Sequence, residues 1–325
     1  MPASTDIGPG CQEQFHRRWH QLTDPHVRAL AWLIDAPSLL DPAAPQWEGR
    51  IAELGGDAGD AARPWLLALD STPRALHAHI ALQAHARLGR YAEQLMTFYL
   101  QHLGVLAEHN LQVRDGDKRT LGEFDFLVWR GEALLHWEFA TKFYLLQSPP
   151  AGAVRQDRAD YFVGPNLADS LGAKMQKIFQ RQLSLSDHPA AQPLLPQPVS
   201  AAQALVKGWL FYPDGDYPVS PALGVCKLHC RGFWCGIDAL PQAPAYAVLP
   251  RLSWLAPARL AAADTLDRGQ FGEALASHFA ADEAMPVLVA LLRIEGGVAL
   301  EMSRGFIVPD GWRERAGQRV QAALE

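Results

Sequence analysis

The chain has 325 residues, a length that allows about two domains. Its 49% hydrophobic and 20% charged residues are typical of a globular protein, and a net charge of −6 excludes a wholly basic nucleic-acid-binding protein but not a local basic face. The first ten residues, MPASTDIGPG, lack the features of a secretory signal, and the longest apolar stretch, PVLVALLRI, is too short to span a bilayer. We therefore expect a cytoplasmic protein with no membrane segment.

Hydrophobic periodicity predicts an α/β fold. Residues 11–85 show apolar residues at helical spacing, which predicts a helical N-terminal segment. A stronger helix, three strands, another helix and a fourth strand then follow, at 87–103, 110–115, 120–130, 132–146, 166–183 and 204–213. The rest mixes helix and strand patterns and includes a hairpin that turns at Gly296–Gly297. We therefore divide the chain into regions 1–85, 86–213 and 214–325.

A predicted hairpin over residues 122–146 carries charged residues among its apolar ones. Because side chains alternate between the two faces of a strand, Glu138 and Lys142 share one face, and the short turn brings Asp125 nearly opposite Glu138. Two carboxylates at that distance repel each other unless a cation neutralises them, and Mg²⁺ prefers such oxygen ligands. The alternative is a solvated strand face that contains an ion pair.

Two predicted helices carry groups that could complete such a site. Glu93, on the helix before the strands, could bind or support a metal, or it could be an ordinary exposed glutamate. Lys174, Lys177 and Arg181 lie on one face of the later helix, where they could contact a phosphate backbone or form a solvated face.

The cysteines predict neither a zinc site nor a disulfide framework. Cys226, Cys230 and Cys235 lie close to His229, whereas zinc ligands usually come as close pairs separated by a longer loop. Together with Cys11 they are too few for a secreted disulfide framework. We therefore expect buried free cysteines, which behave as small hydrophobic residues. The chain also contains no P-loop, G-x-G-x-x-G, H-E-x-x-H or G-x-S-x-G motif.

The sequence resembles two known groups of proteins. GEFD, with Gly122 and Asp125, is similar to the G-x-x-D of the RecB-like branch of the PD-(D/E)XK nuclease-like superfamily, and this resemblance covers about residues 86–213. Over about residues 20–310, the chain looks like domain of unknown function 1853, a bacterial family placed near that fold. The segments that carry the family resemblance are RALAWLIDAPSLL, RLGRYAEQLMTFYLQ, GEFDFLVW, HWEFATKFYL and GPNLADSLGAKMQKIFQRQL.

The superfamily resemblance implies an α-β-β-β-α-β core between the helical N-terminal segment and a C-terminal α/β extension. It also implies that Asp125 and Glu138 bind Mg²⁺ or Mn²⁺, that Lys142 positions water or the scissile phosphate, and that Glu93 assists the metal. One departure is that the superfamily pattern E-x-K is E-F-A-T-K here, with Ala140 at the usual lysine position. Lys142 therefore starts about 13 Å along the strand from Glu138 instead of about 7 Å.

The function expected from these residues is Mg²⁺-dependent hydrolysis of phosphodiester bonds in DNA or RNA. The alternative is a nuclease-like fold that has lost the reaction and binds nucleic acid or protein. The carboxylates and the lysine favour the first function, whereas Ala140 and the acidic net charge favour the second.

Overall fold

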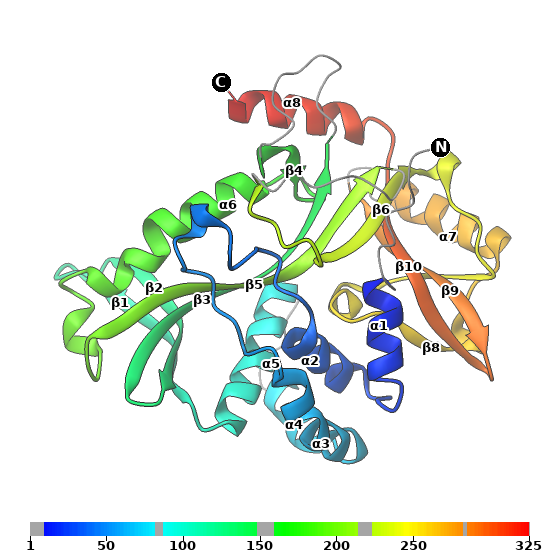
Figure 1. Ribbon diagram of the computed structural model, residues 1–325. Helices are drawn as coiled ribbons and strands as arrows, with labels where there is room; N and C mark the ends of the chain where they lie inside the picture. The colour runs from blue at the N-terminus through cyan, green and yellow to red at the C-terminus, as the bar shows by residue number, and fades with distance from the viewer. Residues whose placement is uncertain (1–9, 82–86, 148–158, 214–222, 282–284, 325) are drawn as a thin grey trace.

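A large mixed β-sheet forms the centre of the protein in a computed structural model that describes residues 10–81, 87–147, 159–213, 223–281 and 285–324 (Figure 1). The strand order is β1-β2-β3-β5-β6-β10-β9-β7, with β4 beside β3 and β8 beside β10. The predicted α/β class is confirmed. The strands are β1 (Leu106–Arg114), β2 (Thr120–Arg130), β3 (Ala133–Leu146), β4 (Phe162–Val163), β5 (Val199–Pro213), β6 (Cys230–Gly236), β7 (Ala245–Val248), β8 (Arg259–Ala261), β9 (Val287–Glu295) and β10 (Val298–Val308).

Helices cover both faces of this sheet. In Figure 1, α2 to α5 lie below the long strands β3 and β5, whereas α6 and α8 lie above the sheet. The helical N-terminal segment is present as predicted. The helices are α1 (Cys11–Arg18), α2 (Pro25–Asp35), α3 (Ala58–Ser71), α4 (Arg74–Ala81), α5 (Leu88–His102), α6 (Leu171–Lys177), α7 (Arg268–Ala281) and α8 (Trp312–Leu324).

The hairpin of β2 and β3 forms where the alternating pattern predicted it. The two strands are antiparallel, with Phe126 opposite Trp137 and Arg130 opposite Ala133, so that two residues make the turn. The first of these is Gly131, whose φ of 61° lies in the left-handed region that glycine adopts without strain. Both predicted strand ranges are confirmed to within one residue.

Helix α6 connects β3 to β5, which pair in parallel. Ser170 begins the helix, since its side chain accepts a hydrogen bond from the Ala173 N–H at 3.2 Å. The chain then widens into a π-helix over Ile178–Gln182. The predicted helix over 166–183 is therefore two pieces with different periods, and its later side chains do not continue the face of α6.

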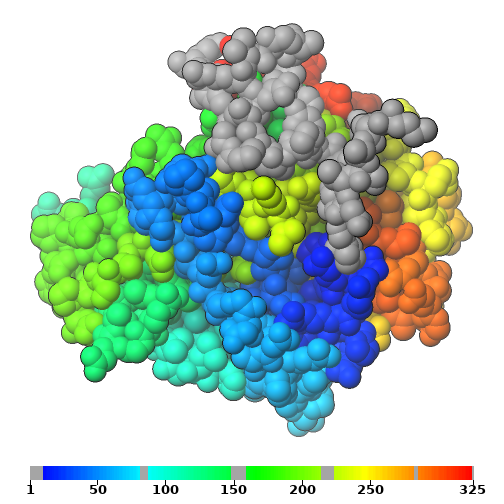
Figure 2. Space-filling view, in the orientation of Figure 1, coloured from blue at the N-terminus to red at the C-terminus, as the bar shows by residue number. Residues whose placement is uncertain are grey.

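The N-terminal helices pack directly on the sheet. Trp32 of α2 stacks on Trp209 of β5, with ring centroids 6.0 Å apart, and both side chains are fully buried. In Figure 2 the dark-blue N-terminal residues lie between the light-blue helices and the orange C-terminal strands. The sheet continues past residue 213, and residues 86 and 214 lie outside the described ranges. The division into three regions therefore stays a prediction.

One cysteine prediction is wrong. Cys11 of α1 and Cys230 of β6 form a disulfide with their Cα atoms 5.5 Å apart, whereas Cys226 and Cys235 are free as expected. Local sequence could not indicate this bond because 219 residues separate the two partners. No helix in the described ranges is long and apolar enough to cross a membrane, which agrees with the prediction of no membrane segment.

Candidate active site

Asp125 and Glu138 lie on adjacent strands at the point where the backbone ladder between β2 and β3 ends. Continuing the register of that ladder by one residue places Asp125 opposite Glu138. Here a side chain of β2 replaces its backbone as the hydrogen-bond partner of β3, since Asp125 Oδ2 accepts the Phe139 N–H at 2.9 Å. Glu138 is only 1% exposed. The predicted carboxyl pair is therefore brought together, with Glu138 buried and Asp125 half-buried.

Two uncharged side chains hold the Glu138 carboxyl group. His136 Nε2 lies 3.0 Å from Glu138 Oε1, and the Gln182 amide donates a hydrogen bond to Oε2. Burial lowers the pKa of His136 to about 4, so the imidazole is neutral at pH 7 and donates from Nε2. Lys174 extends this chain of contacts because its Nζ donates to Gln182 Oε1 at 3.1 Å. Glu138 is thus fixed in orientation by groups that do not cancel its charge.

Three carboxyl groups of the site have a pKa raised to about 7. For Asp125 the cause is burial and then the charge of Glu138, and for Glu93 it is burial and then the charge of Asp125. Burial also raises the pKa of Glu138, although the Lys174 charge and a hydrogen bond with Asp125 oppose the shift. Each group therefore needs a nearby positive charge to be stable as a carboxylate at neutral pH.

Lys142 does not lie where the resemblance implied. Its Nζ forms an ion pair with Asp169 Oδ2 at 3.2 Å, and the Tyr144 hydroxyl donates to the same oxygen at 3.0 Å. Asp169 directly precedes Ser170, the N-cap of α6. The four-residue spacing from Glu138 explains the displacement, since Lys142 lies farther along the strand and meets the loop that leads into α6.

Lys174 is the lysine that the structure brings to the carboxyl pair. Its charge lowers the pKa of both Asp125 and Glu138, while burial and then the Lys142 charge lower its own pKa. Lys177 is exposed, yet its charge also acts on Glu138. Arg181 is exposed on the π-helix, so the three basic residues do not form one regular helix face. Their contact with phosphate stays a prediction.

Glu93 reaches the site from α5. Besides the charge of Asp125, it experiences Arg90, whose Nη1 lies 3.6 Å from Glu93 Oε2. Glu93 is half-buried, so the alternative of an ordinary exposed glutamate is wrong. Its ion pair with Arg90 supports a role beside the carboxyl pair rather than as a metal ligand.

Sequence reasoning assigned neither His136 nor Gln182 to the carboxyl pair. The sequence could have indicated His136, because it lies two residues before Glu138 and so shares its strand face. The sequence could not have indicated the contact of Gln182 with Glu138, because Gln182 lies in the π-helix and a regular helix would have placed its side chain differently.

The donor set suits a hard divalent cation. In the described part of the chain, no group of three or more His, Cys, Asp and Glu side chains is arranged to hold a metal ion. Mg²⁺ is usually held by one or two carboxylates, with water and substrate phosphate completing its coordination. Asp125 and Glu138 supply such oxygen ligands, and their raised pKa values would return to normal beside a cation.

Comparison with known proteins gives one match. A family model described as Domain of unknown function (DUF1853) matches residues 28–308. No curated protein and no solved structure matches the chain.

Proposed function

Because the chain belongs to the DUF1853 family, whose description names no reaction, we propose a function from the site itself: metal-dependent hydrolysis of a phosphodiester bond in DNA or RNA. The observation that carries this proposal is the pair Asp125 and Glu138, which lie next to each other on adjacent strands with a raised pKa on each carboxyl group. Two neighbouring carboxyl groups shielded from solvent cost free energy when both are charged, and such groups with raised pKa values cluster at functional sites.

The surrounding residues have separate roles in this proposal. Asp125 and Glu138 would hold Mg²⁺, and His136 and Gln182 keep the Glu138 oxygens oriented. The bound ion would polarise a phosphate oxygen and lower the pKa of a water molecule. Lys174 is placed to stabilise negative charge that develops on the phosphate.

The arrangement of elements supports the same proposal. Residues 88–213 run through α5, β1, β2, β3, α6 and β5, with the short strand β4 added before α6. This is the order expected for a nuclease-like core of the PD-(D/E)XK type. The exposed Lys177 and Arg181 lie on the α6 side of the carboxyl pair, where they suit a phosphate backbone.

The second candidate function is nucleic-acid or protein binding without hydrolysis. Ala140 replaces the usual lysine and Lys142 is engaged by Asp169, which favours this view. It predicts that nucleic acid binds but is not cut.

The test is cleavage of single- and double-stranded DNA and RNA with Mg²⁺ or Mn²⁺. We expect the substitution Asp125→Asn to reduce cleavage by more than about 100-fold. Substituting residues that only contact a metal ligand already lowers metal affinity or activity by about 10–100-fold. The matched control is Glu132→Gln, which alters an exposed carboxylate in the hairpin turn. Activity that survives Asp125→Asn would overturn the proposal, and binding without cleavage by the native protein would favour the second candidate.

A further inference from the structure

A second unusual site lies on the opposite face of the sheet from the carboxyl pair. In the parallel ladder, Glu138 is opposite Ala204 and Thr141 is opposite Lys207, so Glu138 and Lys207 point to opposite faces. Lys207 is only 5% exposed, in the middle of the central strand β5. Any chemistry at Lys207 is therefore independent of the function proposed above.

Lys207 lines a cavity of about 180 Å³. The walls of this cavity come from the C-terminal end of α2 and the residues after it, and from the glycine-containing loop that leads into α3. Glu53, Gly55 and Gly56 of that loop are exposed, so the cavity lies at the surface, and the buried Lys207 side chain forms part of its lining.

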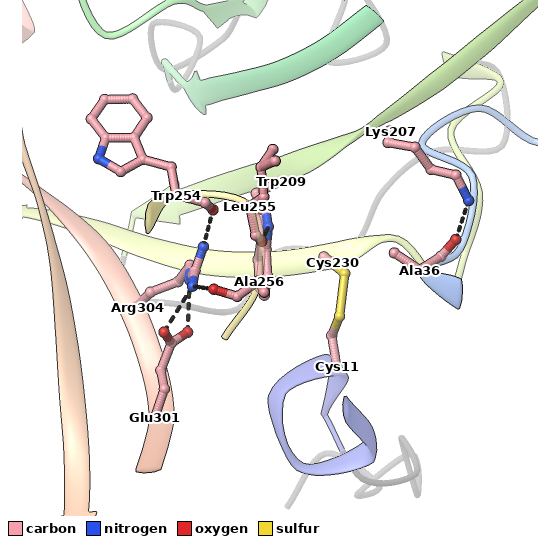
Figure 3. The surroundings of a disulfide bond; sticks show 10 residues. All are labelled: Cys11, Ala36, Lys207, Trp209, Cys230, Trp254, Leu255, Ala256, Glu301 and Arg304. Carbon is pink, nitrogen blue, oxygen red and sulfur yellow. Dashed lines mark hydrogen bonds and ion pairs between the residues drawn. A yellow bond between two sulfur atoms is a disulfide. The ribbon is translucent and has the colours of Figure 1, made fainter. Parts of the chain in front are cut away.

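The amine has a single hydrogen-bond partner within the described residues. Nζ donates to the carbonyl of Ala36, which follows the last residue of α2 (Figure 3). An ammonium group has three N–H donors, and a neutral amine has two donors and a lone pair. Lys207 is thus held by one hydrogen bond, and its remaining donors, or the lone pair of the neutral amine, can bind a ligand in the cavity.

The charges around Lys207 come from three segments. Asp35 at the end of α2, Glu53 in the loop and Cys226 before β6 all act on its charge. Asp35 is itself paired with Arg18, with Nε and Oδ2 3.3 Å apart. Burial outweighs these influences and lowers the pKa of Lys207 to about 8, so that a substantial fraction of the amine is neutral at physiological pH.

We propose that Lys207 is a nucleophilic amine that forms an imine with a small uncharged carbonyl compound held in this cavity. The small volume of the cavity, about 180 Å³, suits a small ligand. The carboxylates of Asp35 and Glu53 disfavour an anion there and favour a neutral aldehyde or ketone.

The chemistry balances without a further reactant. The Lys207 nitrogen attacks the carbonyl carbon, and a carbon–nitrogen double bond replaces the carbon–oxygen double bond. The carbonyl oxygen leaves as water with the two amine protons. The Glu53 carboxylate, on the exposed loop, is the group placed to pass protons between the amine and solvent.

A purely structural role makes a different prediction. A lysine at the C-terminal end of α2 can stabilise the helix through its dipole, and that role needs the charged form. An amine that served only in this way would react more slowly than an exposed lysine, because it would be charged and shielded.

The test is reductive labelling of the full chain with propanal and cyanoborohydride at pH 7.5, followed by mass mapping of the modified lysines. We expect Lys207 to be labelled about tenfold faster than the exposed Lys118 and Lys227, because a lysine with an ordinary pKa is almost entirely protonated at this pH. The rate at Lys207 should rise with a midpoint near pH 8.

Two controls separate the site from general reactivity. Lys227→Arg should leave the labelling of Lys207 unchanged, and unfolding the chain in guanidinium should abolish the preference for Lys207. Labelling of Lys207 at or below the rate of the exposed lysines would overturn the proposal. This measurement uses the native protein, so its outcome does not depend on whether a Lys207 variant folds.

Discussion

At the scale of single residues, the carboxyl pair is held by partners that are themselves uncharged. Neutral His136 and the amide of Gln182 both contact Glu138, and a backbone N–H binds Asp125. These contacts fix the positions of the oxygens without supplying the positive charge that the pair needs. The site is therefore in its least stable electrostatic state when no cation is bound at alkaline pH.

Removing the charge of Asp125 should stabilise the protein. The pKa of Asp125 is raised from 3.8 to about 7, so the folded state binds this proton more tightly than the unfolded chain does. The stabilisation that comes from this bound proton is complete below about pH 4 and is lost as the pH rises through about 7. We expect Asp125→Asn to raise the free energy of unfolding by about 1–3 kcal/mol at pH 8.

Urea denaturation at pH 8 and pH 5 measures this effect. The gain should be smaller at pH 5, where the native carboxyl group is already protonated in the folded state. Glu132→Gln, in the exposed turn, should change stability at neither pH. An Asp125→Asn protein that is no more stable than the native one at pH 8 would contradict the assignment.

Metal binding should depend on pH in the opposite direction. Asp125 and Glu138 must both be deprotonated to bind a cation, and the pKa of each is about 7. We expect Mn²⁺ affinity to rise about tenfold or more between pH 6 and pH 8, with proton release on binding. Isothermal titration calorimetry in two buffers with different ionisation enthalpies measures both quantities. Affinity that is independent of pH would point to a metal site elsewhere.

At the scale of elements, the change from α-helix to π-helix after Lys177 shapes the site. It directs Gln182 to Glu138 and leaves Gln180, two residues earlier, exposed to solvent. Single π-turns of this kind occur often at functional sites because they reorient a side chain that a regular helix would misplace.

Gln182 should therefore matter for activity more than its neighbours do. Gln182→Met removes both the hydrogen bond to Glu138 and the acceptor for Lys174. If the protein hydrolyses phosphodiesters, we expect metal-supported cleavage to fall by about 10–100-fold. Gln180→Met, in the same π-helix, is the matched control and should retain full activity. Equal rates for the two variants would exclude a positioning role for Gln182.

The strands were more predictable than the π-helix for a physical reason. Alternation of apolar and charged residues is a local pattern, and it placed β2 and β3, and with them Asp125 and Glu138, almost correctly. The π-helix contains Gln182, whose partner Glu138 lies on a strand more than forty residues away, and no local pattern indicates that contact. The pairing of Lys142 with Asp169 likewise depends on a loop whose path no local pattern fixes.

At the scale of the whole molecule, one sheet joins the second and third predicted regions, and the disulfide ties the first helix to the middle of that sheet (Figure 3). Sequence patterns indicated the elements but neither this long-range bond nor the packing of Trp32 on Trp209. Both contacts arise from tertiary structure, which leaves no periodic trace in the sequence.

Breaking the disulfide should destabilise the whole fold. It closes a loop of 219 residues, which restricts the unfolded chain strongly. We expect Cys11→Ser to lower the free energy of unfolding by about 2–5 kcal/mol. Thermal denaturation with and without dithiothreitol measures this, with Cys226→Ser as the control because Cys226 is free. A reductant that leaves the native protein's melting temperature unchanged would show that the bond is not formed in solution.

The position of α1 against β10 has a consequence for how the chain is made. His16 of α1 bonds the carbonyl of Glu301, 285 residues later, and the neighbouring Phe15 and Trp19 are buried. At about 5–20 residues per second, a ribosome needs roughly 15–60 s to reach Glu301 after His16 has been synthesised. During that interval the partner strand of α1 does not exist. The face of α1 that contacts β10 is then exposed on the nascent chain, where a chaperone can bind it.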